Sequence, residues 1–303
     1  MSRFLLRRLF FALLLVIGVA SASFALVHLA PGDFYTQFGP EADESAARAG
    51  RAAAGLDRPF ARQYADWLSR AARLDFGQSL KFRRPVSDLL GERARNTAVL
   101  AAAALLLATA VGVPLGVYTG TRRGGLLRHA VRALSMLLLA VPPLVGALAL
   151  TALFARAGWL APGGASAANL VVPALALALP LAAIVERMQS QAMRDVLGEP
   201  YLRAALARGV PPRLVIWRHA LRAALAPLAG VYGIIAGSLL SGSFVVEIVT
   251  DWPGLGVLMA DGLRSRDIFL VAGCAAAVSV LLAIAILLSD LLHLWLDPRV
   301  RES

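Results

Sequence analysis

Cysteine and lysine are nearly absent from this chain of 303 residues. The single cysteine, Cys274, excludes a disulfide within the chain and a cysteine-rich metal site. The single lysine, Lys81, lies between Leu80 and Phe82, so the Gly-Lys-Ser/Thr of a nucleotide-binding P-loop is missing. Any ATP that powers this protein must therefore be bound by another polypeptide.

Charged residues are also scarce, at 16% of the chain, whereas 58% of the residues are hydrophobic. A bilayer is crossed by roughly 20 helical residues, and six apolar stretches are long enough to do so. They are 8–29, 97–119, 133–155, 170–187, 224–248 and 268–294. Helices satisfy their own backbone hydrogen bonds in lipid, which predicts an all-α polytopic membrane protein with six transmembrane helices.

The first stretch follows three arginines, as a signal peptide would. It is longer than a usual signal core, and no small-x-small cleavage pattern closes it, so we expect a retained span. The expected division of the chain is 1–30 for the N-terminus and first span, 31–95 for an outer segment, and 96–303 for a five-helix core. That core includes the basic loop 187–222.

The placement of arginine predicts the orientation. Sixteen basic residues lie on one side of the spans, in the N-terminus, 120–132, 187–222 and the tail after 296. The short connections on the other side hold three. The positive-inside rule therefore puts both termini in the cytoplasm. The segment 31–95 would lie outside, and its eleven basic residues are nearly balanced by nine acids. The net charge of +11 follows mostly from this topology, so we expect the lipid bilayer and not nucleic acid as a partner.

The outer segment contains one amphipathic stretch, at 59–77. One helical face would carry Phe60, Tyr64, Trp67, Leu68, Ala71 and Leu74, and the other Arg62, Asp66, Arg70 and Arg73. Two interpretations are open. The helix lies flat at the outer membrane interface with Tyr64 and Trp67 at headgroup level, or it belongs to a small soluble cap.

Small residues and prolines indicate how the spans pack. The rows Gly112/Gly116/Gly120 and Gly233/Gly237 allow helices to approach closely. Prolines 114, 142, 143, 173 and 180 are expected to bend or break helices.

The basic loop has a structure of its own. Residues 199–208 predict a short helix that Gly209 stops, Val210-Pro211-Pro212 predicts an extended turn, and 213–223 restart a helix. Ala204, Ala205 and Ala207 would face outward, where a partner can dock closely and pair its acids with Arg203 and Arg208. The alternative is a basic loop that only satisfies the positive-inside rule and touches anionic lipid.

Residues 187–222 resemble the "EAA" loop of ABC importer permeases, which reads Glu-Ala-Ala, three residues, Gly, nine residues, then Ile-x-Leu-Pro. Arg203-Ala204-Ala205 stands in the Glu-Ala-Ala place, and Gly209 and Leu221 have the right spacing. His219 and Arg222 replace the Ile and Pro, as is typical of the dipeptide/oligopeptide/nickel permeases. The resemblance continues in Leu29-Ala30-Pro31-Gly32-Asp33, Leu74–Ser79, Asp251–Gly256 and Asp297–Arg301.

This resemblance implies a type I ABC importer permease fold in the bacterial inner membrane, with no catalytic residue and no cofactor of its own. It implies three kinds of partner: a homologous permease subunit, usually a different chain; two cytoplasmic ABC ATPase subunits that bind ATP and Mg; and a periplasmic substrate-binding protein. The residues expected to couple to the ATPase are Tyr201, Arg203, Ala204, Ala205, Arg208 and Gly209. Trp252, Pro253, Gly254 and Gly256 are expected at the periplasmic gate or at the binding-protein contact, the alternative being an interfacial Trp followed by a tight turn.

Polar residues inside the fifth span have two interpretations. Ser238, Ser241, Ser243 and Glu247 either line the translocation path or hydrogen-bond neighbouring helices. Among the other ionisable groups, Asp290 and His293 are three residues apart, and they either bond each other or bond cytoplasmic water.

Two other functions compete with ATP-driven import. A proton-coupled secondary transporter needs buried acids near mid-membrane, but the acids here lie near span ends. An intramembrane serine protease needs a Ser/His pair, but Ser243 lies toward the outside and His293 toward the cytoplasm. The cargo stays open among peptides and related small solutes such as nickel complexes.

Overall fold

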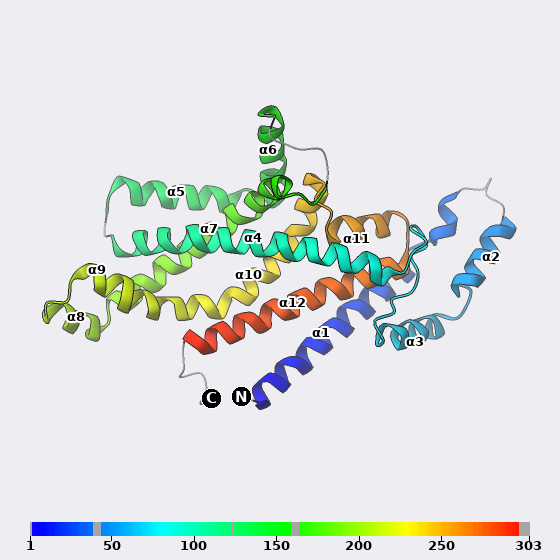
Figure 1. Ribbon diagram of the computed structural model, residues 1–303, viewed down its shortest axis with the longest axis horizontal. Helices are drawn as coiled ribbons and strands as arrows, with labels where there is room; N and C mark the ends of the chain where they lie inside the picture. Colours follow the sequence, from blue (N-terminus) through cyan, green and yellow to red (C-terminus); the bar gives the residue numbers. More distant parts are fainter. Residues whose placement is uncertain (1, 39–43, 123, 159–163, 297–303) are drawn as a thin grey trace. The chain divides into compact units, whose positions relative to one another are not determined.

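The computed structural model describes residues 2–38, 44–122, 124–158 and 164–296 (Figure 1). Regular structure in these ranges is helical, and the only β pairing is an isolated bridge between Gln78 and Pro85. The elements are α1 (Ser2–Leu29), η1 (Phe34–Phe38), α2 (Glu44–Ala54), α3 (Phe60–Ala71), α4 (Val86–Thr121), α5 (Leu126–Ala140), α6 (Pro143–Arg156), α7 (Ala167–Leu197), α8 (Pro200–Ala207), α9 (Pro212–Leu214), η2 (Val215–Ala220), α10 (Leu221–Thr250), α11 (Leu255–Arg264) and α12 (Ile268–Leu296).

Five helical segments are long and apolar enough to cross a membrane. They are Leu6–Thr36, Val86–Thr121, Ala167–Leu197, Pro212–Thr250 and Ile268–Leu296. A sixth crossing exists if the bent pair α5 and α6 counts as one span. The prediction of an all-α polytopic membrane protein is confirmed.

The third predicted span, 133–155, is not one straight helix. The axes of α5 and α6 differ by 105°, a bend that Figure 1 shows plainly. The break lies at Val141, whose extended backbone (φ −85°, ψ 117°) is the conformation that a following proline imposes. Pro143 then occupies the first position of α6, where its missing N–H leaves no hydrogen bond unmade.

The other prolines singled out in the sequence do not break their helices. Pro114 lies inside α4, and Pro173 and Pro180 lie inside α7. Pro227, inside α10, is accommodated in the same way. The expectation of a helix break is therefore met only at the adjacent pair Pro142-Pro143.

The chain forms two compact units. The larger unit comprises Ala98–Trp252 and the chain from Ile284 onward, and the smaller unit comprises Ser2–Thr97 and Pro253–Ala283. Each has its own apolar core. The expected boundaries at 30/31 and 95/96 describe membrane topology and not compactness, and they stay a prediction.

In the larger unit, α4 and α7 approach through the glycine row predicted from the sequence. A Cβ on Gly112 would lie 2.7 Å from the Ala182 carbonyl oxygen, and one on Gly120 would lie 2.7 Å from that of Ser190. Only hydrogen fits at these positions, so the row is a packing seam. The second row is looser, because a Cβ on Gly233 would lie 3.6 Å from its nearest neighbours on α12.

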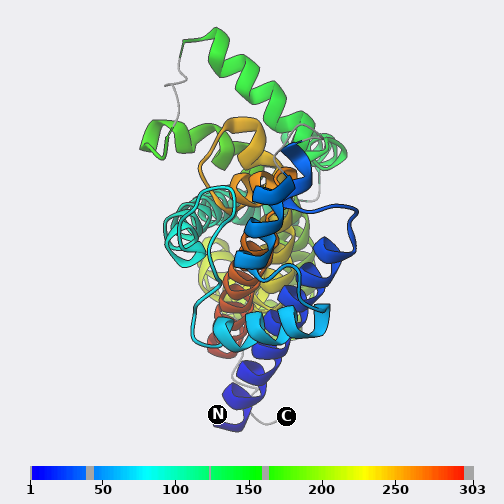
Figure 2. The same cartoon turned by 90° about the vertical axis from the view of Figure 1, so that its right-hand side faces the viewer.

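In the smaller unit, α3 lies across α1 (Figure 2). The Trp67 side chain is 1% exposed and its ring lies 5.1 Å from that of Phe24, centroid to centroid. The Tyr64 hydroxyl lies 2.7 Å from that of Ser21. The apolar face of α3 is therefore packed on protein, which favours the cap over the flat interfacial helix. Leu74 is not part of that face, because α3 ends at Ala71 and Leu74 has φ 63° and is 74% exposed.

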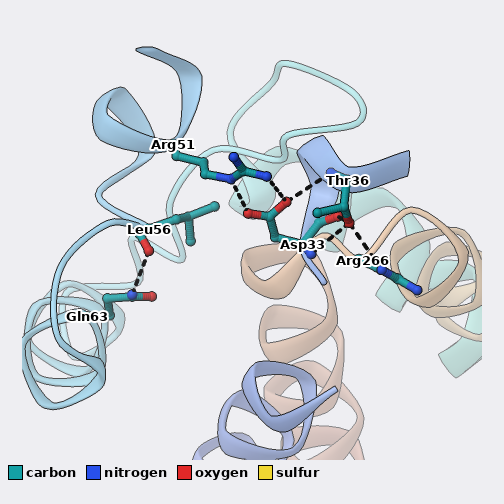
Figure 3. Close-up of polar contacts among 6 residues, drawn as sticks. All are labelled: Asp33, Thr36, Arg51, Leu56, Gln63 and Arg266. Carbon is teal, nitrogen blue, oxygen red and sulfur yellow. Dashed lines mark hydrogen bonds and ion pairs between the residues drawn. The ribbon is translucent and has the colours of Figure 1, made fainter. Parts of the chain in front are cut away.

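Polar contacts fix the segment that follows α1 (Figure 3). The Arg51 guanidinium donates to both carboxylate oxygens of Asp33, at 2.5 and 3.1 Å, and Arg266 donates to the Thr36 hydroxyl at 3.1 Å. The hydrogen bond and charge of Asp33 raise the pKa of Arg51. Gln63 Nε2 donates to the Leu56 carbonyl at 3.1 Å.

A buried carboxylate organises the start of α12 in the same unit. Asp267 is fully buried and accepts from the Ser79 hydroxyl at 2.7 Å, the Lys81 backbone N–H at 3.1 Å and the Leu270 backbone N–H at 3.2 Å. Through the last of these bonds it caps α12. Asp267 thus ties the 78–85 loop to a helix that begins almost 190 residues later.

Candidate functional site

The helix predicted at 199–208 is present as α8, and its C-terminal end has a defined hydrogen-bond pattern. The Gly209 N–H donates to the Leu206 carbonyl at 3.0 Å, and the Val210 N–H donates to the Ala205 carbonyl at 3.2 Å. These are the two bonds of a Schellman motif, which requires a left-handed residue after the helix. Gly209 provides it with φ +83°.

A side chain at Gly209 would meet no clash, because no atom lies within 4 Å of the Cβ position. The demand for glycine is therefore conformational and not steric. The helix stop expected at Gly209 is therefore present, and it depends on the left-handed backbone of this residue.

The inner face of α8 packs on the ends of the long helices. Leu202 and Ala205 are 1% and 8% exposed and belong to a cluster with Val117, Met193 and Val215. The expectation that Ala205 faces outward is wrong. An eight-residue helix joined to long helices at both ends must bury one face, and positions three apart share it.

The outer face of α8 carries the other predicted coupling residues. Tyr201, Arg203, Ala204, Ala207 and Arg208 are exposed. The Arg203 guanidinium donates to the Gly198 carbonyl at 2.9 Å, so it also holds the end of α7. The small side chains of Ala204 and Ala207 leave the backbone of α8 open to close approach by a partner.

Four exposed apolar side chains surround α8, and the sequence analysis singled out only one of them, Tyr201. Tyr201 and Leu206 on α8 are 51% and 44% exposed, and Leu214 and Trp217 just beyond it are 43% and 55% exposed. All four precede the predicted fifth span, 224–248. Exposed apolar groups gathered outside a span indicate a protein contact surface.

The connection from α8 to α10 is stiff. Pro211 and Pro212 form the predicted turn, with Pro211 extended at φ −56° and ψ 135°, and Pro212 starts α9. The π-helical segment η2 (Val215–Ala220) then leads directly into α10. π-helical turns are rare in proteins, and those that occur are often found at functional sites.

The four predicted path residues do not share one face of α10. Ser238 and Ser241 are exposed, in a stripe with Ile234, Val245 and Ile248. Ser243 and Glu247 are buried and do not belong to this stripe, and their role in a path stays a prediction. The Ser243 hydroxyl donates to the Leu240 carbonyl of its own helix at 2.9 Å.

At the inner end of α12, His293 contacts α10. Its Nδ1 lies 3.0 Å from the Ala226 carbonyl oxygen, which can only accept, so the ring N–H donates. Ser289 nearby donates to the Ala229 carbonyl at 2.9 Å. These bonds join α12 to α10.

The Trp-Pro-Gly-Leu-Gly stretch is a buried turn and not an exposed aromatic. Trp252 is 3% exposed in the core of the larger unit, which corrects its placement at the membrane interface or on a binding-protein contact surface. The turn forms because Asp251 is left-handed (φ 53°) and the Trp252 N–H donates to the Glu247 carbonyl at 2.9 Å.

The residues after Trp252 are held by the start of α4. The Asn96 side-chain amide donates to the Pro253 carbonyl at 2.8 Å, and the Leu255 N–H donates to the Thr97 hydroxyl at 2.8 Å. Gly254 and Gly256 are buried on either side of Leu255. Asn96 and Thr97, which the sequence did not point to, therefore position this turn.

Comparison with known proteins gives matches over nearly the whole chain. Residues 112–302 match the family described as the binding-protein-dependent transport system inner membrane component, and residues 1–101 match the N-terminal part of such membrane components. The chain is 33% identical to the dipeptide transport system permease protein DppB of Escherichia coli (strain K12), over 100% of both chains.

Two further relatives come from distant bacteria. The oligopeptide transport system permease protein AppB of Bacillus subtilis (strain 168) is 30% identical over 99% of both chains, and the oligopeptide transport system permease protein OppB of Mycobacterium bovis is 33% identical over 100% of both. The chain therefore belongs to the inner-membrane permease components of binding-protein-dependent ABC transport systems.

Proposed function

We propose that this permease moves peptides, or related small solutes such as nickel complexes, into the cytoplasm, and that α8 couples it to separate ATPase subunits. The observation that carries the proposal is the exposed outer face of α8, whose C-terminal end is fixed by the Schellman stop at Gly209 and the Pro-Pro turn, and whose other end is tied to the end of α7 by Arg203. A helix fixed at both ends transmits a push to α7 and α10 without bending.

The cargo class is supported by the names of the relatives, which are dipeptide and oligopeptide permeases at 30–33% identity over nearly the full chain. The proposed partners are supported by the description of the family as binding-protein-dependent and by the absence of a P-loop from the sequence. We propose two ABC ATPase subunits with ATP and Mg, a periplasmic binding protein, and a second, homologous but different permease chain.

Ser238 and Ser241 remain our candidates for the path. They are the polar members of an exposed stripe on α10 that otherwise carries Ile234, Val245 and Ile248. In the assembled pair of permeases we propose that this stripe faces the second permease across the path. The turn at Trp252–Gly256 is proposed as a buried pivot of the outer gate, positioned by Asn96 and Thr97.

The coupling role is tested by Ala204→Glu. A Glu on the outer face of α8 adds bulk and an unpaired charge where the ATPase docks, without touching the buried face. We expect the affinity for the ATPase subunits to fall by about tenfold or more, measured by co-purification and by ATP hydrolysis of the assembled complex.

Ala65→Glu is the matched control. Ala65 is an exposed alanine on a short amphipathic helix, α3, in the segment predicted to lie outside. It should leave ATPase binding unchanged. Full ATPase binding and ATP hydrolysis in the Ala204→Glu complex would refute the docking role of α8.

A further inference from the structure

A cavity of about 460 Å³ opens between α5 and α7 in the larger unit. Three arginines line it: Arg132 from α5, and Arg187 and Arg194 from α7. None of the three forms an ion pair with a carboxylate in the described part of the chain. Arg194 donates to the neutral side chains of Ser190 and Gln191, at 3.2 and 2.8 Å. The cavity therefore carries uncompensated positive charge.

The one carboxylate in the cavity wall is already engaged. Glu186 is 2% exposed. Its Oε1 accepts from the Thr119 hydroxyl at 2.5 Å, and its Oε2 accepts from the Ser135 hydroxyl at 3.0 Å. Both oxygens are thus turned toward hydroxyl donors of α4 and α5. One carboxylate against three guanidinium groups leaves a site that attracts an anion.

The polarity of the cavity changes along α5. Arg132 lies midway along α5, on the side of the cavity nearer the basic connection that the arginine distribution puts toward the cytoplasm, whereas Met136 and Leu139, one and two turns further on, line the cavity toward the bilayer interior. Neighbouring side chains of α5 are apolar and open, with Leu134 54% and Leu137 61% exposed. A ligand that fits has an anionic head and an apolar tail.

We propose that this cavity binds an anionic phospholipid of the inner leaflet, with its phosphate against Arg132 and Arg194 and its acyl chain along Met136 and Leu139. Guanidinium groups bind phosphate oxygens in a bidentate manner. Basic pockets between transmembrane helices on the cytoplasmic side suit anionic headgroups. The proposal depends on the inner-membrane location of this family and not on the coupling role of α8.

Fluorescent phosphatidylglycerol and phosphatidylcholine test the proposal by titration of the purified, delipidated assembly of this chain with its partner subunits. We expect clear preference for phosphatidylglycerol. An arginine near an anionic lipid surface contributes about fivefold in affinity, so Arg132→Gln with Arg194→Gln should weaken phosphatidylglycerol binding by roughly 25-fold. The single variant Arg132→Gln, expected to lose about fivefold, decides the question if the double variant fails to assemble.

The matched control is Arg213→Gln with Arg218→Gln. It removes the same charge from exposed positions on the same predicted side of the membrane, outside the cavity. This control should keep the preference for phosphatidylglycerol. Equal losses in the control and cavity variants would overturn the site, because general charge attraction would explain them.

Two further arms separate the lipid from other occupants. Glycerol 3-phosphate should compete at least tenfold more weakly than phosphatidylglycerol; equal competition would assign the site to a free phosphate compound and overturn the lipid. A photo-reactive residue in place of Met136 should form an adduct with lipid. An adduct with the second permease chain instead would show that protein covers the cavity and would also overturn the proposal.

Discussion

Single glycines of α4 control how closely two helices approach. Gly112, Gly116 and Gly120 face α7, where added Cβ atoms would meet backbone carbonyls at 2.7 Å. A backbone oxygen in a packed helix cannot move aside as the tip of a side chain can. The row was readable from the sequence because its spacing of four residues is that of one helix face.

Gly116→Ala should therefore destabilise the chain. Its Cβ would lie 2.6 Å from the Gln189 Cβ and 2.7 Å from the Glu186 carbonyl oxygen, and overpacking of this kind costs about 1–3 kcal/mol of unfolding free energy. Gly18→Ala, in α1, is the control, since that Cβ would meet no neighbouring atom within 4 Å. Thermal unfolding in one detergent compares them. Equal melting temperatures for the two variants would contradict the packing seen between α4 and α7.

Burial at the residue scale was harder to predict than glycine spacing. Ala204 and Ala205 are both alanines, so the local sequence does not distinguish them. Ala205 is buried because its side of α8 packs on Val117 and Met193. Trp252 was expected at the periplasmic gate or the binding-protein contact, with an interfacial position as the alternative, but it is buried in a core whose members come from helices distant in sequence. The sequence pattern of a single helix does not show which of its side chains other helices will cover.

At the scale of elements, local signals located most helices, and contacts distant in the sequence set their ends. The helix break at Pro142-Pro143 lies where the sequence predicted a bend or a break. The sequence did not predict the 105° angle between α5 and α6. The cap at Asp267 joins residues more than 180 positions apart, and no periodicity reveals such a pair.

Asp267→Asn tests this connection. The NH2 group of the asparagine would face one of the three donors that now bond the Asp267 carboxylate, so at least one of these hydrogen bonds would be lost. Each hydrogen bond to a buried charged group contributes about 1.5–3 kcal/mol. We expect the start of α12 and the 78–85 loop to loosen, so trypsin should cut faster after Arg83.

Asp261→Asn is the matched control for this loop. Its ion pair with Lys81 is about one third exposed, and surface pairs contribute roughly 0–1 kcal/mol. Trypsin cleavage should therefore stay near the wild-type rate. Slower cleavage of Asp267→Asn than of Asp261→Asn would refute the role of Asp267.

At the scale of the whole molecule, the account depends on the orientation of the chain in the membrane. The number of spans follows from hydropathy and the direction from arginine placement, both of which the sequence contains. The two compact units were not predicted, because each is assembled from two separate segments of the chain.

The orientation predicts opposite labelling of α3 and α8. Ala65→Cys should react with a membrane-impermeant maleimide added outside intact cells, whereas Arg208→Cys should react only after the cytoplasmic face is opened. The native Cys274 is fully buried and should not react with the maleimide in either variant. Labelling of Arg208→Cys from outside would contradict the topology.

The most direct measurement of the central claim is ATP hydrolysis stimulated by the binding protein in the reconstituted transporter, compared between Gly209→Asn and Gly209→Val. Both side chains fit in the open space around Gly209, but asparagine tolerates a φ of +83° and valine does not. Gly158→Val, with φ +71° and equally open space, is the control at the end of α6. The account predicts that Gly209→Asn and Gly158→Val keep stimulated hydrolysis and uptake, while Gly209→Val loses most of both. Wild-type stimulation and uptake in Gly209→Val would contradict the claim that a stiff α8 transmits the work of the ATPase.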